Sequence, residues 1–173
     1  MTPGPERVAI HQAGHAVVQT LVGRQRWAVA RVSLKAHHGG TWQGKSTRGE
    51  SCLDRETVLG LYEFGLVTLA GIAAEENYMK QQPPEADPVV ALSDLAEWHE
   101  AAWLLLESEA RVDMVSSSVM QKLAEMLAEE RVWKVVELLA AQLLANGTVE
   151  GELLLQFLNM LPTYPPEKSG DIP

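Results

Sequence analysis

The sequence is short of cysteine, of positive charge and of long apolar runs, and each shortage argues against a class of protein. Its 173 residues include one cysteine, Cys52, which cannot close an intramolecular disulfide, so we expect a reducing, cytoplasmic location. The 14 Lys and Arg residues face 23 Asp and Glu residues, and a net charge of −9 argues against nucleic acid or an anionic membrane as partners. No window approaches the roughly 20 apolar residues of a membrane span.

The hydrophobic content of 46% is sufficient for one domain with a real core. We expect this domain to cover residues 1–161, and we expect the proline-containing segment 162–173 to be a disordered tail. No internal repeat or second linker is visible in the sequence. The chain is therefore expected to form a single folded unit.

The hydrophobic pattern predicts a mostly α fold of the α+β type, with a small early β-hairpin or sheet. Residues 28–35 alternate between two faces, which is typical of a half-buried strand, and a second short strand is expected around 41–43. Gly65, Gly71 and Ala74 favour close helix packing. The expected helices cover residues 6–22, 54–79 with Asp54 as N-cap, 93–110 with Ser93 as N-cap, 117–145 and 150–160.

Two histidines carry the clearest chemical signal in the sequence. His11 and His15 are four residues apart in a predicted helix, so both imidazoles lie on one face at the spacing that binds a single zinc ion. The spacing alone also fits two helix histidines that bond to backbone carbonyls or water. The residues around the pair are needed to decide between these readings.

Several segments, in the same order along the chain, resemble the FtsH family of ATP-dependent zinc metalloproteases. The matching segments are 8–18 (V-A-I-H-Q-A-G-H-A-V-V), similar to the active-site helix, 29–34, similar to the substrate-side strand, 69–76 (L-A-G-I-A-A-E-E), similar to a helix of the family, 93–95 (S-D-L), and 138–153, similar to its closing helix pair. The resemblance spans about residues 6–160. It implies a helical, FtsH-type peptidase-like domain over residues 1–161.

The resemblance implies that zinc is held by His11, His15 and Asp94, with an open fourth position as in catalytic zinc sites. It also implies that Glu75 orients a ligating imidazole from behind. The residues themselves leave plainer readings open, because Asp94 also suits a helix N-terminus and Glu75 also suits a solvated surface.

Gln12 stands where the family has its general-base glutamate. An amide cannot accept the proton that this base removes, a role worth about 10²–10⁴ in rate, so we expect hydrolysis to be weak or lost. Three explanations remain: a naturally silenced protease that keeps its metal site, an engineered inactive form that traps substrate, or a displaced base such as Glu75 or Glu76.

The first functional prediction is a zinc-dependent metallopeptidase-like domain that hydrolyses or binds extended peptides or unfolded protein, paired to the edge of strand 29–34. The alternative is a catalytically silent zinc-binding interaction or assembly module, which Gln12 favours. A third reading is a metal-free helical domain. Family members also carry a membrane anchor and an ATPase module and form sixfold rings. The ring suggests a homo-oligomer, but neither module is recognisable in this sequence, which removes a major ring contact and makes any ATPase a separate partner.

Overall fold

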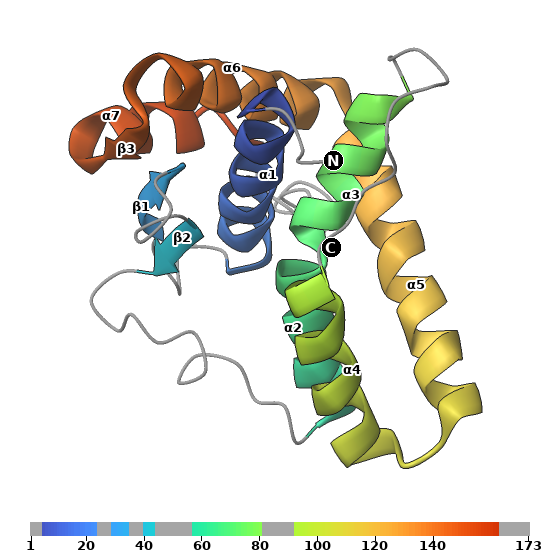
Figure 1. Ribbon diagram of the computed structural model, residues 1–173. Helices are drawn as coiled ribbons and strands as arrows, with labels where there is room; N and C mark the ends of the chain where they lie inside the picture. The colour runs from blue at the N-terminus through green and yellow to red at the C-terminus, as the bar shows by residue number, and fades with distance from the viewer. Residues whose placement is uncertain (1–4, 24–28, 35–39, 44–56, 81–91, 163–173) are drawn as a thin grey trace, which may run out of the picture.

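The computed structural model describes residues 5–23, 29–34, 40–43, 57–80 and 92–162. These residues form seven helices and a small antiparallel sheet, which confirms the mostly helical fold with an early sheet (Figure 1). The predicted tail was 162–173, and its residues from 163 onward lie outside the described residues. The elements are α1 (Pro5–Gly23), β1 (Val29–Ser33), β2 (Gly40–Gln43), α2 (Val58–Thr68), α3 (Ala70–Met79), α4 (Leu92–Leu106), α5 (Glu109–Ala128), α6 (Glu130–Asn146), β3 (Thr148–Glu150) and α7 (Gly151–Leu158).

Helix α1 lies at the centre of the fold and is packed by α2, α3, α6 and β1 (Figure 1). Its small residues make this possible, because short side chains let neighbouring helices approach closely on several sides. Ala9, Ala13, Ala16, Val17 and Val18 are all fully buried. The half-buried positions on α1 include those of the predicted site.

Helices α5 and α6 complete the core beside α3 and α1. Leu123 and Leu127 of α5, and Leu139 and Leu143 of α6, have no exposed surface. Each fully buried leucine contributes about 1.5–3 kcal/mol relative to an exposed one, so this apolar layer stabilises the positions of α1 and α3.

The strand order β2-β1-β3 corrects two expectations about residues 28–35. Strand β1 is central, because β3 pairs with it on the side away from β2, so β1 offers no free edge for a substrate. Its alternation is also interrupted by a register shift between Val29 and Arg31, and Val29 and Val32 are both buried. The short pattern Thr148–Glu150 was too brief to reveal a third strand in the sequence.

The expected helix over 54–79 is two helices, α2 and α3, bent by 47°. The break is at Leu69, whose backbone leaves the helical region with φ −93° and ψ 3°. Helix α2 begins after Thr57, whose hydroxyl accepts a bond from Gly60 N, whereas Asp54 lies outside the described residues. No single described helix has the length and hydropathy of a membrane span; α2 and α3 pass those criteria only as a bent pair.

Several further helix boundaries differ from the expectation, including the start of α5, which is at Glu109 rather than 117. Helix α4 ends at Leu106 rather than 110, and Ser108 caps α5 by accepting a bond from Arg111 N. The expected helix over 117–145 is divided at Glu129, whose side chain caps α6. Ser93 lies inside α4 rather than before it. The predicted end at Asn146 is confirmed, since Gly147 follows with a φ of 80°.

Candidate metal centre

The predicted site residues meet where helices α1 and α3 are in close contact. A Cβ added at Gly14 of α1 would lie 2.5 Å from the Ala74 Cβ, and one added at Gly71 of α3 would overlap the His11 ring. Only hydrogen fits at these two positions. The glycines therefore let the backbones come near enough for the α1 histidines to reach side chains of α3 and α4.

Three nitrogen and oxygen atoms from distant parts of the sequence converge at this contact. His11 Nε2 lies 3.1 Å from His15 Nε2 and 3.1 Å from Asp94 Oδ2, and His15 Nε2 lies 3.3 Å from the same oxygen. Asp94 comes from the first turn of α4, as expected, where the helix dipole favours a carboxylate. The structure thus brings together His11, His15 and Asp94, the three residues implied by the resemblance.

The outer ring nitrogens determine how the two histidines face one another. His15 Nδ1 lies 2.9 Å from the Val67 carbonyl, which can only accept, so this nitrogen carries a proton. His11 Nδ1 donates in the same way to Glu75 Oε2 at 2.7 Å. In the neutral rings, both Nε2 atoms then present lone pairs to each other and to Asp94, which is unfavourable unless a cation lies among them.

The spacing of the three atoms suits a metal ion. Ligands placed about 2.0–2.1 Å from a tetrahedral ion lie about 3.3 Å from one another, close to the separations of 3.1, 3.1 and 3.3 Å seen here. The group could therefore hold a metal ion. Two imidazoles and one carboxylate are used by proteins for both zinc and iron(II), so the ligand set leaves the metal's identity open.

Without a metal, the same geometry attracts a proton to His11. Burial lowers the pKa of His11, but hydrogen bonds and charges from Asp94 and Glu75 outweigh burial and raise it to about 9. Burial raises the pKa of Asp94, but hydrogen bonds from His11 and His15 outweigh it and hold the pKa well below its ordinary 3.8. Both shifts have one main cause, the close approach of the Asp94 carboxylate to the imidazoles.

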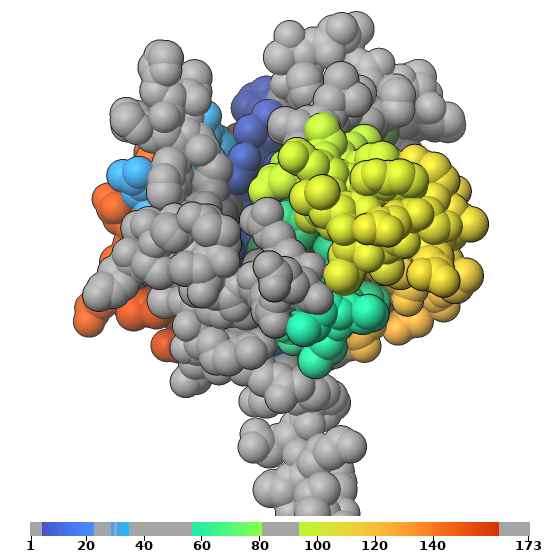
Figure 2. Space-filling view, turned by 90° about the horizontal axis from the view of Figure 1, so that it is seen from below, coloured from blue at the N-terminus to red at the C-terminus, as the bar shows by residue number. Residues whose placement is uncertain are grey.

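The cluster is half-buried rather than sealed from solvent. The side chains of His11, His15 and Asp94 are 14%, 15% and 21% exposed. In the space-filling view of Figure 2, part of α1 (dark blue) is visible between α4 (yellow-green) and β1 (light blue). Gln12, next to His11 on α1, is also half-buried. The three side chains are thus mostly shielded while a face of α1 stays within reach of solvent.

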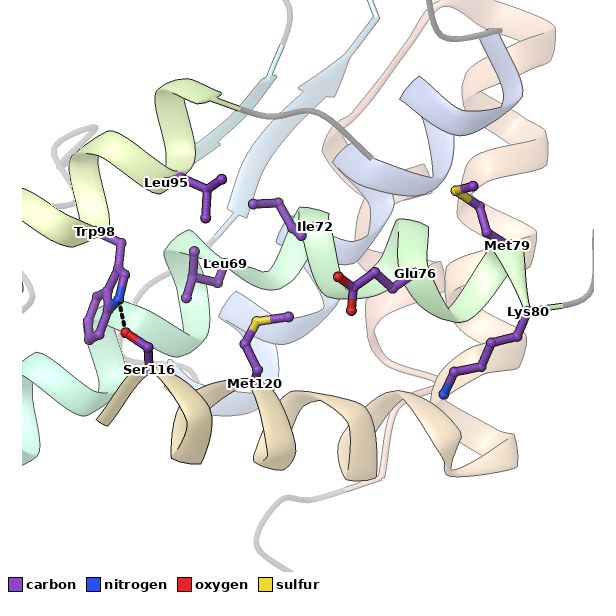
Figure 3. Close-up of a pocket in the computed structure, with 9 residues that line it drawn as sticks. All are labelled: Leu69, Ile72, Glu76, Met79, Lys80, Leu95, Trp98, Ser116 and Met120. Atoms are coloured by element: carbon purple, nitrogen blue, oxygen red, sulfur yellow. Dashed lines mark hydrogen bonds between the residues drawn. The ribbon is translucent and has the colours of Figure 1, made fainter. Parts of the chain in front are cut away.

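Glu75 and Glu76 lie on different faces of α3. Glu75 is 5% exposed, and it accepts bonds from His11 through Oε2 and from Arg7 through Oε1. Glu76 is exposed and lines a cavity of about 680 Å³ between α3, α4 and α5 (Figure 3). The resemblance implied a supporting role for Glu75, and the hydrogen bond to His11 is the contact that such a role requires.

Comparison with protein-family models and with curated proteins found no match to this chain. The resemblance to the FtsH family therefore rests on the sequence motifs alone, while the structure shows a group that could hold a metal ion.

Two residues that shape this centre were missed as site residues. Arg7 precedes His11 by four positions, a spacing that puts both on one helical face and could have identified it. Gly71 was expected only to aid helix packing, and nothing in the sequence indicated that the His11 ring would lie against it.

Proposed function

We propose that this chain is an FtsH-like, zinc-binding peptidase-type domain that has lost most or all of its hydrolytic activity. His11, His15 and Asp94 hold the zinc, and Glu75 fixes His11 from behind. The observation that carries the proposal is the convergence of His11 Nε2, His15 Nε2 and Asp94 Oδ2 within 3.1–3.3 Å, while both Nδ1 atoms are bonded elsewhere.

A zinc ion in this position would polarise a peptide carbonyl and make water a stronger nucleophile. The protein must still remove a proton from that water and deliver one to the leaving amine. Gln12 occupies the position of the family's base, and its amide can orient a water molecule but cannot take its proton. Binding of an extended chain then persists without efficient cleavage.

The contacts of the neighbouring carboxylates do not favour a displaced base. Both oxygens of Glu75 already accept hydrogen bonds, one from His11 and one from Arg7. Glu76 lines the cavity on the α4–α5 side of α3 (Figure 3), whereas Glu75 bonds to His11 of α1. Gln12 therefore has no obvious substitute among these two residues.

A peptide that binds by strand addition would have to use an edge other than β1. Strands β2 and β3 each pair with β1 alone among the described strands, so their outer edges are the candidates in place of the strand expected from the sequence. The second candidate function, a silent assembly module built on the same metal, is favoured by Gln12 as well. Partners of either kind, including a separate ATPase or further copies of this chain, remain proposals.

Metal content tests the foundation of this proposal. The full chain, purified without added metal, should contain about one zinc per chain by elemental analysis, with iron measured in the same sample. Substitution of His15→Ala should abolish this content, while His99→Ala, on an exposed part of α4, should leave it unchanged. Metal content near zero that zinc addition does not restore would refute a metal centre.

A proteolysis assay tests the assignment of Gln12. The wild type and Gln12→Glu are compared on an unfolded protein substrate, with Gln12→Glu/His15→Ala as the metal-free control. Activity in Gln12→Glu alone, increased by about 10² or more, supports a silenced peptidase site. Comparable activity in both proteins would favour a displaced base, and activity in neither would favour the assembly module.

A further inference from the structure

Arg7 contacts the carboxylate that supports the metal centre. Its guanidinium places Nε 3.3 Å and one terminal nitrogen 3.2 Å from Glu75 Oε1, so two donors converge on one oxygen. The other oxygen, Oε2, accepts the bond from His11 Nδ1 at 2.7 Å. Each oxygen of Glu75 therefore has a different partner, and both partners come from one face of α1.

This arrangement restricts how the Glu75 carboxylate can turn. A carboxylate bonded through one oxygen can rotate about its last torsion, whereas a rigid arginine fork on the second oxygen opposes that rotation. The pair is also well shielded, with Arg7 12% and Glu75 7% exposed at their side chains. A shielded carboxylate that lost its cation would gain by turning toward water and away from His11.

We propose that Arg7 is a positioning residue of the metal centre, acting through Glu75 to hold the His11 ring with Nε2 toward His15 and Asp94. This inference rests on the proposed metal-binding function and adds a residue that lies one contact further from the metal. Arg7 itself is not one of the ligands, because its guanidinium contacts Glu75. Its effect is to fix the direction of one lone pair.

If Arg7 acts through its charge, replacing it should change the metal affinity in one direction, and if it acts by positioning His11, the affinity should change in the other direction. Removing a positive charge near a cation site should tighten cation binding if electrostatics dominate. If positioning dominates, the same change loosens His11 and weakens binding. Arg7→Lys separates the two further, since it keeps the charge but loses the planar fork.

The test measures Zn²⁺ and Co²⁺ affinity of the full chain by competition with a chromophoric chelator. The variants are Arg7→Met, Arg7→Lys and the matched control Arg111→Met, on an exposed turn of α5. We expect about a tenfold loss of affinity in Arg7→Met, at the lower end of the 10–100-fold typical of outer-shell partners, and a smaller loss in Arg7→Lys. Arg111→Met should stay within about twofold, since it has no link to the site.

A double-mutant cycle tests whether Arg7 acts through Glu75. In a Glu75→Gln background, adding Arg7→Met should change affinity by less than about twofold. Equal or tighter binding in Arg7→Met, or a full additional loss in the double variant, would overturn the proposal. If Arg7→Met fails to fold by circular dichroism, Arg7→Lys decides, and unchanged affinity there overturns it.

The two proposals fail in different ways. A wild type that takes up neither ion removes the metal centre, and the role of Arg7 with it. A wild type that binds the ions, together with an unaffected Arg7→Met, removes the role of Arg7 alone.

Discussion

Helix α3 has two contrasting faces, and its adjacent glutamates lie one on each. On the face toward α1, Glu75 is 5% exposed and has a defined partner for each oxygen. On the face toward α4 and α5, Glu76 is exposed and borders an apolar cavity (Figure 3). Identical side chains one position apart thus have different surroundings, because the helix packs tightly on one side and loosely on the other.

The side chains around each glutamate explain this difference. Gly71 and Ala74 are small and let α3 meet α1 without a gap. Ile72 and Met79 on the other face are larger, and the contact with α4 and α5 leaves a space of about 680 Å³ between the helices. A ligand set needs its atoms held within a fraction of an ångström, which only the tight face provides.

The largest expected loss of zinc affinity comes from adding a methyl group on the tight face of α3, the face that packs against α1. Gly71→Ala places a methyl group against Nε2, Cε1 and Cδ2 of His11, so the ring must turn away and the site loses one of its three ligands. We expect the zinc affinity to fall by at least about 100-fold, measured by chelator competition.

Gly14→Ala is the comparison for this variant. Its methyl group would meet Ala74 Cβ at 2.5 Å and the Ala70 carbonyl oxygen at 3.1 Å, away from the imidazoles. The thermal midpoint of the metal-free protein should therefore fall more in Gly14→Ala than in Gly71→Ala, because a side chain can move aside more easily than a helix. Full zinc affinity in Gly71→Ala would show that the tight face is not needed to hold His11.

The next largest effect comes from replacing each of the two glutamates in turn by glutamine. Glu75→Gln removes the charge that holds the His11 Nδ1 proton and leaves Arg7 without its carboxylate, so zinc affinity should fall about 10–100-fold. Glu76→Gln, the same change one position later, should alter affinity by less than about twofold. Equal effects of the two changes would mean that only net charge matters.

The bounds of α1 could be predicted well from the sequence, but the breaks between the later helices could not. The apolar spacing and the stop at Gly23 define α1, and the structure agrees. The breaks at Leu69, Glu107 and Glu129 lie in stretches of good helix formers. They depend on caps and on tertiary packing that periodicity does not record.

The three residues that meet at the site were predicted, and so was the contact of Glu75 with His11, but the supporting residues Arg7 and Gly71 were not. The spacing of His11 and His15 follows from helix geometry, whereas Asp94 was assigned through the resemblance alone and comes from a separate helix. The contact of Arg7 with Glu75 depends on how closely α1 approaches α3. That approach depends on both Gly14 and Gly71. How closely two helices pack cannot be predicted from the sequence of either helix alone.

Zinc affinity should also depend on pH, because His11 binds a proton in the metal-free protein. In the metal-free protein the pKa of His11 is about 9, so at neutral pH a metal must displace a proton from this ring. Zinc affinity should therefore rise about tenfold per pH unit between pH 7 and 8. Glu76→Gln should show the same slope, and an affinity independent of pH in this range would contradict a protonated His11.

The free energy of unfolding of the metal-free protein should fall at both high and low pH. The folded-state pKa of His11 lies above the ordinary 6.5, so its contribution is complete below pH 6.5 and is lost as pH rises through about 9. The pKa of Asp94 is lowered, so its contribution is present above its ordinary 3.8 and is lost as pH falls below that value. Denaturant titration of metal-free protein should thus show greatest stability between these limits.

The smallest expected effect is a loss of stability on the loose face of α3, the face toward α4 and α5. Trp98 is 3% exposed, and its indole Nε1 donates to Ser116 Oγ at 2.7 Å (Figure 3). Ser116→Ala removes the acceptor and should cost about 1 kcal/mol in the free energy of unfolding, since the neighbouring cavity lets water replace the lost partner. Ser118→Ala, at an exposed position of α5, controls for helix propensity. Zinc affinity should be unchanged in both, because the cavity wall contributes no ligand. A loss of affinity in Ser116→Ala would instead show that the two faces of α3 are coupled through the helix.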